Sequence, residues 1–158
     1  MTRVLAVFAL VLAQSAWGAA ACRFSSSVPD MGFGNYDLLT TAPTDTQLDV
    51  LVQCDRIGGP QNVTIDLGIN QGTYGTSVAN RRLGMAGGTD VLNYGLFRDA
   101  GRSANWGFTN GVDTGSLTLS VPNNGSATGT FRIFGRIPAR QNVSPGSYSD
   151  RIQFTLSP

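Results

Sequence analysis

The sequence predicts an all-β domain made of two packed sheets. Apolar and polar residues alternate in several short runs, and turn residues such as Gly, Pro, Asn and Ser separate these runs. The chain contains no Glu and no Lys, two of the better helix formers, and no stretch has a convincing helical period. Its 158 residues suit a single domain.

The first 21 residues have the pattern of a secretory signal peptide. Arg3 supplies a positive charge, residues 4–13 form an apolar segment, and the small residues at 18–21 offer cleavage sites. We therefore expect the mature domain to comprise residues 22–158, with cleavage between Ala20 and Cys22. No other segment is long and apolar enough to suggest a membrane span.

The two cysteines, Cys22 and Cys54, are predicted to form a disulfide, because an exported chain with two cysteines usually pairs them. The bond would close a loop of roughly 30 residues and stabilise the domain by about 3–4 kcal/mol in the chain-entropy model. Lipidation of Cys22 is the alternative. Ala19, three residues earlier, is not the bulky aliphatic residue of a lipoprotein site, and lipidation would leave Cys54 unpaired.

The first half of the domain contains one especially clear strand. Leu48, Val50, Val52 and Cys54 alternate with polar residues and share one face. The extended segments expected in this half are Cys22–Val28, Met31–Asp37 with a kink permitted by its glycines, Gln47–Cys54 and Asn62–Gly68.

The second half continues the pattern of short strands and turns. The expected segments are a short edge strand Arg81–Ala86, then Val91–Asp99, Leu117–Val121, a strand from Phe131, and a last strand that contains Ile152, Phe154 and Leu156. Asn123-Asn124-Gly125 is a strong turn signal. Seven or eight such strands without a helix predict an immunoglobulin-like β-sandwich.

The last strand lacks an obvious neighbour. Ile152, Phe154 and Leu156 form an apolar face, but only Ser157 and Pro158 follow them. A strand with unpaired backbone groups needs a partner along each edge. Either an earlier strand of this chain or a strand of another chain must cover it.

Enzyme chemistry is not expected. Because the chain has no His, it can form neither a Ser-His-Asp triad nor a Cys-His pair, and a zinc site is disfavoured. Asp113-Thr-Gly-Ser116 matches the local signature of an aspartic protease. That chemistry needs two such carboxylates, and a turn explains the single copy.

Metal, cofactor and nucleic-acid binding are not expected either. Asp45, Asp49, Asp55 and Asp66 could supply oxygen ligands for calcium, but their spacing matches no EF-hand loop. Without the signal peptide the 10 Asp residues balance the remaining Arg residues, and a nearly neutral domain lacks the basic face that nucleic acid requires.

Trp106 and Phe108 lie on a predicted glycine-rich loop and are candidates for binding a sugar or a surface. Aromatic residues of a small sandwich also serve as core residues, so both interpretations stay open.

The order of several short motifs resembles the spore coat protein U domain family. The motifs are Phe33-Gly-Asn-Tyr-Asp37, the strand ending at Cys54, Arg82-Leu83, Leu92-Asn-Tyr94, Leu96-Phe-Arg-Asp99, Trp106-Gly107, Phe134-Gly-Arg-Ile137, Gln141-Asn-Val143 and Pro145-Gly-Ser-Tyr-Ser-Asp150. The family includes subunits of archaic chaperone–usher pili.

The resemblance implies an incomplete sandwich that lacks its last strand, with Ile152, Phe154 and Leu156 lining an acceptor groove. It also implies export to the cell surface, adhesion and biofilm formation, and assembly by donor-strand complementation. The implied partners are a periplasmic chaperone, an outer-membrane usher and neighbouring subunits. Such pilins carry a donor segment before the first cysteine. This sequence has almost none there, which suggests a subunit that only accepts a strand. The alternative is a self-contained secreted surface-binding module.

Overall fold

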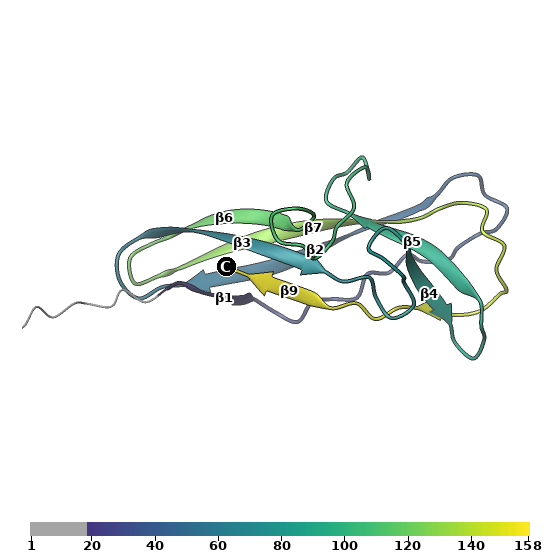
Figure 1. The fold of residues 1–158 in the computed structure, drawn as a ribbon, viewed down its shortest axis with the longest axis horizontal. Coiled ribbons are helices and arrows are strands. Elements are labelled where there is room, and N and C mark those ends of the chain that lie inside the picture. The colour runs from purple at the N-terminus through teal and green to yellow at the C-terminus, as the bar shows by residue number, and fades with distance from the viewer. Residues whose placement is uncertain (1–18) are drawn as a thin grey trace, which may run out of the picture.

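The computed structural model describes residues 19–158, so the predicted signal peptide lies almost entirely outside the described part. The described residues form nine strands in two antiparallel sheets and no helix. Accordingly, residues 19–158 contain no helix long and apolar enough to cross a membrane. Figure 1 shows an elongated molecule in which β4 and β5 lie toward one end of the long axis and β6 toward the other.

The six-stranded sheet has the order β1-β2-β7-β5-β4-β8. Its strands are β1 (Ala21–Phe24), β2 (Thr44–Asp55), β7 (Ser126–Ile137), β5 (Val91–Phe97), β4 (Arg81–Met85) and β8 (Tyr148–Ser149). The three-stranded sheet has the order β6-β3-β9, with strands β6 (Gly115–Val121), β3 (Gln61–Ile69) and β9 (Phe154–Ser157).

The paired strands β2 and β7 are the longest elements and form the centre of the larger sheet. They run antiparallel over their full length, from Thr44 opposite Ile137 to Asp55 opposite Ser126. Their inward-facing apolar residues, such as Val50 and Ile133, are almost completely buried. On the outer face, Asp49 lies opposite Arg132 and accepts hydrogen bonds of 2.7 and 2.8 Å from its guanidinium group. The two faces of one strand pair thus separate core from solvent, as the alternating sequence predicts.

The smaller sheet packs over part of this surface through Val63, Ile65 and Leu67 of β3. Trp106 also lies in this core. Its ring makes an edge-to-face contact with Phe131 at 6.2 Å between centroids, and its indole N–H donates to the carbonyl of Leu67 at 2.7 Å. The predicted β-sandwich is therefore confirmed.

Two predicted segments near the start of the domain differ from the structure. The first strand ends at Phe24 rather than at Val28, and Met31–Asp37 forms no strand although its backbone runs without a helix or turn. This segment has no backbone ladder with a neighbour. Its aromatic side chains hold it instead, and Gly34 adopts a left-handed φ of 75°. The predicted strand from Phe131 and the predicted last strand lie in different sheets, as β7 and β9.

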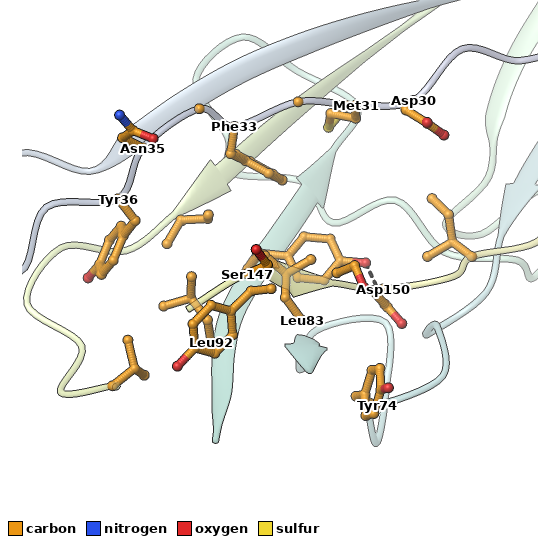
Figure 2. Close-up of a pocket in the computed structure, with 18 of the residues that line it drawn as sticks. Asp30, Met31, Phe33, Asn35, Tyr36, Tyr74, Leu83, Leu92, Ser147 and Asp150 are labelled. Carbon is orange, nitrogen blue, oxygen red and sulfur yellow. Dashed lines mark hydrogen bonds between the residues drawn. The ribbon is translucent and has the colours of Figure 1, made fainter. Parts of the chain in front are cut away.

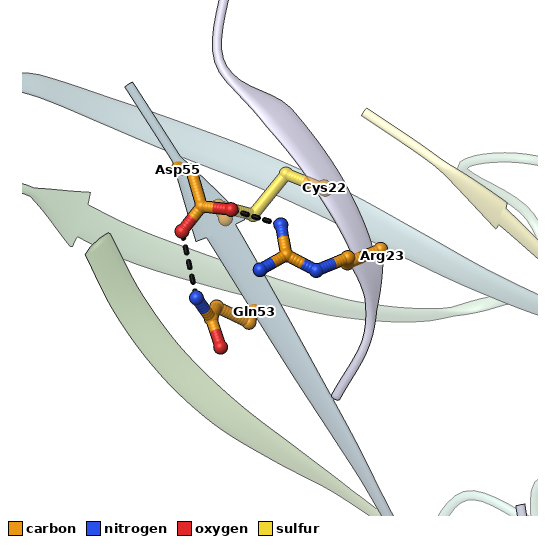
Figure 3. The surroundings of a disulfide bond; sticks show 5 residues. Cys22, Arg23, Gln53 and Asp55 are labelled. Carbon is orange, nitrogen blue, oxygen red and sulfur yellow. Dashed lines mark hydrogen bonds and ion pairs between the residues drawn. A yellow bond between two sulfur atoms is a disulfide. The ribbon is translucent and has the colours of Figure 1, made fainter. Parts of the chain in front are cut away.

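The predicted disulfide between Cys22 and Cys54 is confirmed. The two residues lie opposite each other in the register of β1 and β2, and Cys54 is fully buried. Figure 3 shows that Asp55 accepts hydrogen bonds from both Gln53 and Arg23 beside this bond. These two partners lower the pKa of the Asp55 carboxyl group. Because the sulfur atoms of Cys22 and Cys54 are bonded to each other, Cys22 has no free thiol group for the alternative of lipidation.

Candidate functional site

The described part of the chain contains a groove of about 1610 Å³. One wall is the segment 28–39 and the other is the segment 143–154; we call them the N-terminal wall and the C-terminal wall. Figure 2 shows Phe33 and Tyr36 projecting from the N-terminal wall toward the side of the groove that carries Leu83 and Leu92. Two segments more than 100 residues apart in sequence therefore form one site.

The floor of the groove is the inner face of the larger sheet and is strongly apolar. It consists of Leu48, Leu83, Leu92, Tyr94, Leu96, Ile133 and Ile137. β4 and β5, which supply four of these residues, lie beyond the smaller sheet along the long axis (Figure 1). Apolar side chains that face inward at this end consequently border a cavity instead of a second layer of strands.

Aromatic residues hold the N-terminal wall in place. The ring of Phe33 contacts the ring of Tyr94 edge-on at 5.9 Å between centroids. The hydroxyl group of Tyr36 donates to the carbonyl of Pro138 at 2.9 Å and accepts from the backbone N–H of Gln141 at 2.8 Å. The Gln141 side chain in turn makes hydrogen bonds of 2.7 and 2.8 Å with both backbone groups of Asn93 in β5. The wall is thus anchored to the sheet without a β-ladder.

The C-terminal wall depends on polar contacts of Asp150. Its carboxylate accepts a hydrogen bond of 2.7 Å from the hydroxyl group of Tyr94 and one of 2.8 Å from the backbone N–H of Thr73. Burial raises the pKa of Tyr94, and the hydrogen bond to Asp150 raises it further, so the hydroxyl group stays protonated and donates. Tyr94 of the floor and Thr73 of a neighbouring loop are therefore both hydrogen-bonded to Asp150 of the C-terminal wall.

The N-terminal wall and β9, of which only Phe154 belongs to the C-terminal wall, have backbone edges without a strand partner among the described residues. β9 pairs with β3, with Leu156 opposite Leu67 and Phe154 opposite Ile69. It is the outer strand of its sheet, so no strand of the described residues pairs with its other edge. The N-terminal wall has no ladder partner either. An apolar trough between two such backbone segments has the geometry needed to accept an additional extended strand.

The structure places two of the three predicted groove residues in this groove. Ile152 and Phe154 line it and are half-buried. Leu156 packs against the core cluster and lies outside the groove lining. The sequence left open whether an earlier strand of this chain or a strand of another chain lies beside the last strand. In the structure β3 pairs with one edge of β9 only.

The other predicted residues lie elsewhere. Trp106 is only 2% exposed, so of the two aromatic candidates only Phe108, which is 56% exposed, is presented at the surface. The carboxylate of Asp113 accepts from the backbone N–H of Thr109 at 2.7 Å, as expected for a turn. Asp45 pairs with Arg136 and Asp49 with Arg132, and residues 19–158 contain no group of three or more His, Cys, Asp or Glu that could hold a metal ion.

The sequence analysis did not identify Arg81 as a key residue of this region. Its side chain is fully buried in β4, opposite Tyr94 of β5. The guanidinium group donates to four backbone carbonyls at 2.7–2.9 Å, those of Ile69, Asn70, Val78 and Trp106. Burial lowers the pKa of Arg81 to about 10. Arg81 thereby fixes the ends of the loop that carries Thr73 and Tyr74 into the groove lining. An arginine in a short strand gives no sequence signal for this role.

Comparison with known proteins defines the class and the family. The fold is a pilin-like β-sandwich: the P pilus rod subunit PapA superimposes with a TM-score of 0.50 at 17% identity, over 86% of this chain and 97% of that one. The Spore Coat Protein U domain model matches residues 7–155, and the chain belongs to this family. Its members are structural proteins rather than enzymes, which confirms the expectation that this chain is not an enzyme.

Two further similarities were found. Protein U of Myxococcus xanthus is 28% identical over 137 residues, which cover 80% of this chain and 70% of that protein. A chain of a chaperone–tip adhesin complex of CFA/I fimbriae biogenesis has a TM-score of 0.48 at 14% identity, over 88% of this chain and 41% of that one. The latter similarity adds nothing to the assignment of the fold.

Proposed function

We propose that this protein is an exported subunit of a chaperone–usher surface fibre, and that its groove accepts a β-strand from another polypeptide. The observation that carries the proposal is the open trough between the N-terminal and C-terminal walls, with an apolar floor and an unpaired edge of β9. A strand with alternating apolar residues would bury this floor and pair with the exposed backbone.

The proposed partners follow from this geometry and from the pilin-like fold. A periplasmic chaperone would fill the groove first, an outer-membrane usher would export the subunit, and a neighbouring subunit would supply the final strand. The protein would reach the cell surface, where the fibre would contribute to adhesion and biofilm formation. The family membership and the fold support this order of events.

Co-expression with the chaperone of such an assembly system tests the proposal. We expect the chain to copurify with the chaperone, and the substitution Ile152→Arg to abolish copurification because it places a charge among apolar groove residues. Leu51→Arg is the matched control, since Leu51 is 48% exposed on the outer face of β2 and should tolerate the change. A monomeric chain that folds cooperatively and ignores both the chaperone and donor peptides would overturn the proposal.

A self-contained surface-binding module is the second candidate. The exposed ring of Phe108 on a loop fixed by hydrogen bonds favours it, because such a ring is presented to solvent in one position. We expect Phe108→Ala to weaken attachment of cells to a surface without any change in folding or in chaperone binding if Phe108 binds that surface. Unchanged attachment would contradict it.

A further inference from the structure

The outer face of β3 and β6 carries rows of short polar side chains that the groove does not use. The rows follow the strand register: Asn62 lies opposite Ser120, Thr64 opposite Thr118, and Asp66 opposite Ser116. All six residues are exposed except Asp66, which is half-buried, and none of them lines the groove. We call these six residues the polar platform.

Hydrogen bonds within each row hold the polar platform in one arrangement. The hydroxyl groups of Thr64 and Thr118 are 2.9 Å apart, Ser120 donates to the Asn62 side-chain oxygen at 2.6 Å, and Ser116 donates to Asp66. A hydroxyl group has one donor and two acceptor sites, so each still has capacity for a ligand. Because the side chains are already ordered, a ligand would lose less conformational entropy on binding them.

Two features mark the ends of the platform. At one end, Gly68 follows Asp66 on the same face, and a Cβ atom there would lie only 3.2 Å from the Cα of Phe108. The absence of a side chain lets the Phe108 loop lie against the strand, with its ring 56% exposed. At the other end, Asn62 and Ser120 border a shallow hollow with Pro60 and Pro122. The distance from Asn62 to Gly68 along the strand is about 20 Å, at about 3.4 Å per residue.

The charge of the platform limits the class of ligand. Asp66 is its one charged residue, and it accepts a hydrogen bond from Ser116. The outer face of β2 and β7 differs, because it carries the ion pairs Asp49–Arg132 and Asp45–Arg136. A polyanion would find no complementary charge on the polar platform, and a polycation would find only the single carboxylate of Asp66. A neutral polymer with many hydroxyl groups matches it, since hydroxyl groups both donate and accept hydrogen bonds and sugar rings pack against aromatic and proline side chains.

From these observations we propose that the polar platform, together with Phe108, is a binding site for an extended neutral polysaccharide. The site shares no residue with the proposed strand-acceptor groove, so a strand bound in the groove does not occupy it. The sequence-based hypothesis placed sugar or surface binding on Trp106 and Phe108. The site proposed here keeps Phe108 and replaces Trp106 with the outer face of β3 and β6.

Affinity electrophoresis of the exported full chain tests this site. The gels contain hydroxyethylcellulose, dextran or, as the anionic comparison, alginate. We expect at least one of the neutral polymers to retard the chain and alginate to leave it unretarded. The double substitution Thr64→Val and Thr118→Val removes two hydroxyl groups while keeping the β-branched shape. It should weaken the retardation about five-fold or more, the change expected for about one lost neutral hydrogen bond.

The matched control is the double substitution Thr128→Val and Thr130→Val on the outer face of β7, where both residues are exposed. It should leave the retardation unchanged, and Phe108→Ala should reduce it. Circular dichroism of each variant confirms that the sheets persist. The proposal is overturned if neither neutral polymer retards the chain, if alginate retards it equally, or if the platform and control variants bind equally well. Because the readout does not involve a chaperone, failure of this site and failure of the groove are separate results.

Discussion

The hydroxyl group of Tyr94 donates a 2.7 Å hydrogen bond to the carboxylate of Asp150 and joins the floor of the groove to its C-terminal wall. Tyr94 is only 7% exposed, and its ring also contacts Phe33 of the N-terminal wall. One side chain therefore touches both walls.

Removing that hydroxyl group should loosen the C-terminal wall. We expect Tyr94→Phe to lower the free energy of unfolding by about 1.5–3 kcal/mol, the usual contribution of a hydrogen bond to a charged partner. Urea unfolding followed by circular dichroism measures the change. Tyr74→Phe is the control, because Tyr74 is 48% exposed and its hydroxyl group should contribute little. Equal effects of the two substitutions would contradict the role of the Tyr94–Asp150 contact.

The same contact predicts a loss of stability in alkaline solution. The folded-state pKa of Tyr94 is raised by burial and by Asp150, whereas an unfolded tyrosine ionises near pH 10. Above about pH 10 the unfolded chain releases this proton first, so the free energy of unfolding should fall by about 1.4 kcal/mol per pH unit. Arg81 acts in the opposite direction there, because its pKa is lowered to about 10 and the folded state loses that proton first.

Comparing the wild-type chain with Tyr94→Phe at each pH separates these two groups. The substitution removes the tyrosine contribution, together with the electrostatic effect by which Tyr94 raises the pKa of Arg81. We expect the stability difference between the two proteins to shrink steadily above about pH 10. A difference that stays constant from pH 8 to pH 12 would show that Tyr94 ionises as it does in the unfolded chain.

Replacing Arg81 should be among the most destabilising changes in the domain. Arg81→Met leaves the carbonyls of Ile69, Asn70, Val78 and Trp106 without this donor in a buried region. The expected loss is about 3–5 kcal/mol. Arg82→Met is the matched control on the next residue. The buried Nε atom of Arg82 has no hydrogen-bond partner, so its replacement should change stability by less than about 1 kcal/mol. Thermal melting of both variants distinguishes the two outcomes.

The disulfide should contribute mainly by restricting the unfolded chain. It joins residues 32 apart in sequence, and its loss should lower the free energy of unfolding by about 3–4 kcal/mol. The double substitution Cys22→Ala and Cys54→Ala should match the effect of dithiothreitol on the wild-type chain in urea unfolding. If the reductant leaves the midpoint of the wild-type transition unchanged, the stabilising role of the bond is wrong.

Sequence reasoning succeeded where a pattern is local. The alternation from Leu48 to Cys54 identified β2 and the inward face that brings Cys54 to Cys22. It also placed the centre of β3, because apolar residues alternate from Val63 to Leu67. A two-residue period determines the buried face of a strand directly, so these elements needed no knowledge of the partner strands.

Features that depend on distant partners could not be predicted in the same way. Met31–Asp37 has the composition of a strand, but it forms no ladder, because Phe33 and Tyr36 hold it through contacts with residues about 60 to 105 positions away. For Arg81 the sequence predicts only a place at the start of a short edge strand. Its burial depends on four carbonyls that converge only in the folded chain. Of the groove, the sequence identified Ile152 and Phe154 and missed the second wall entirely.

Site-specific photo-crosslinking tests the proposed strand-acceptor groove most directly. A photoreactive phenylalanine analogue is placed at Phe154, which lines the groove, or at Thr155, the next residue, which is exposed on the opposite side of β9. The labelled chains are produced together with the chaperone and usher of the assembly system. We predict that the probe at Phe154 forms an adduct with an extended strand of the chaperone or of a neighbouring subunit, and that the probe at Thr155 does not. Equal labelling from both positions, or adducts only within the chain itself, would contradict the account.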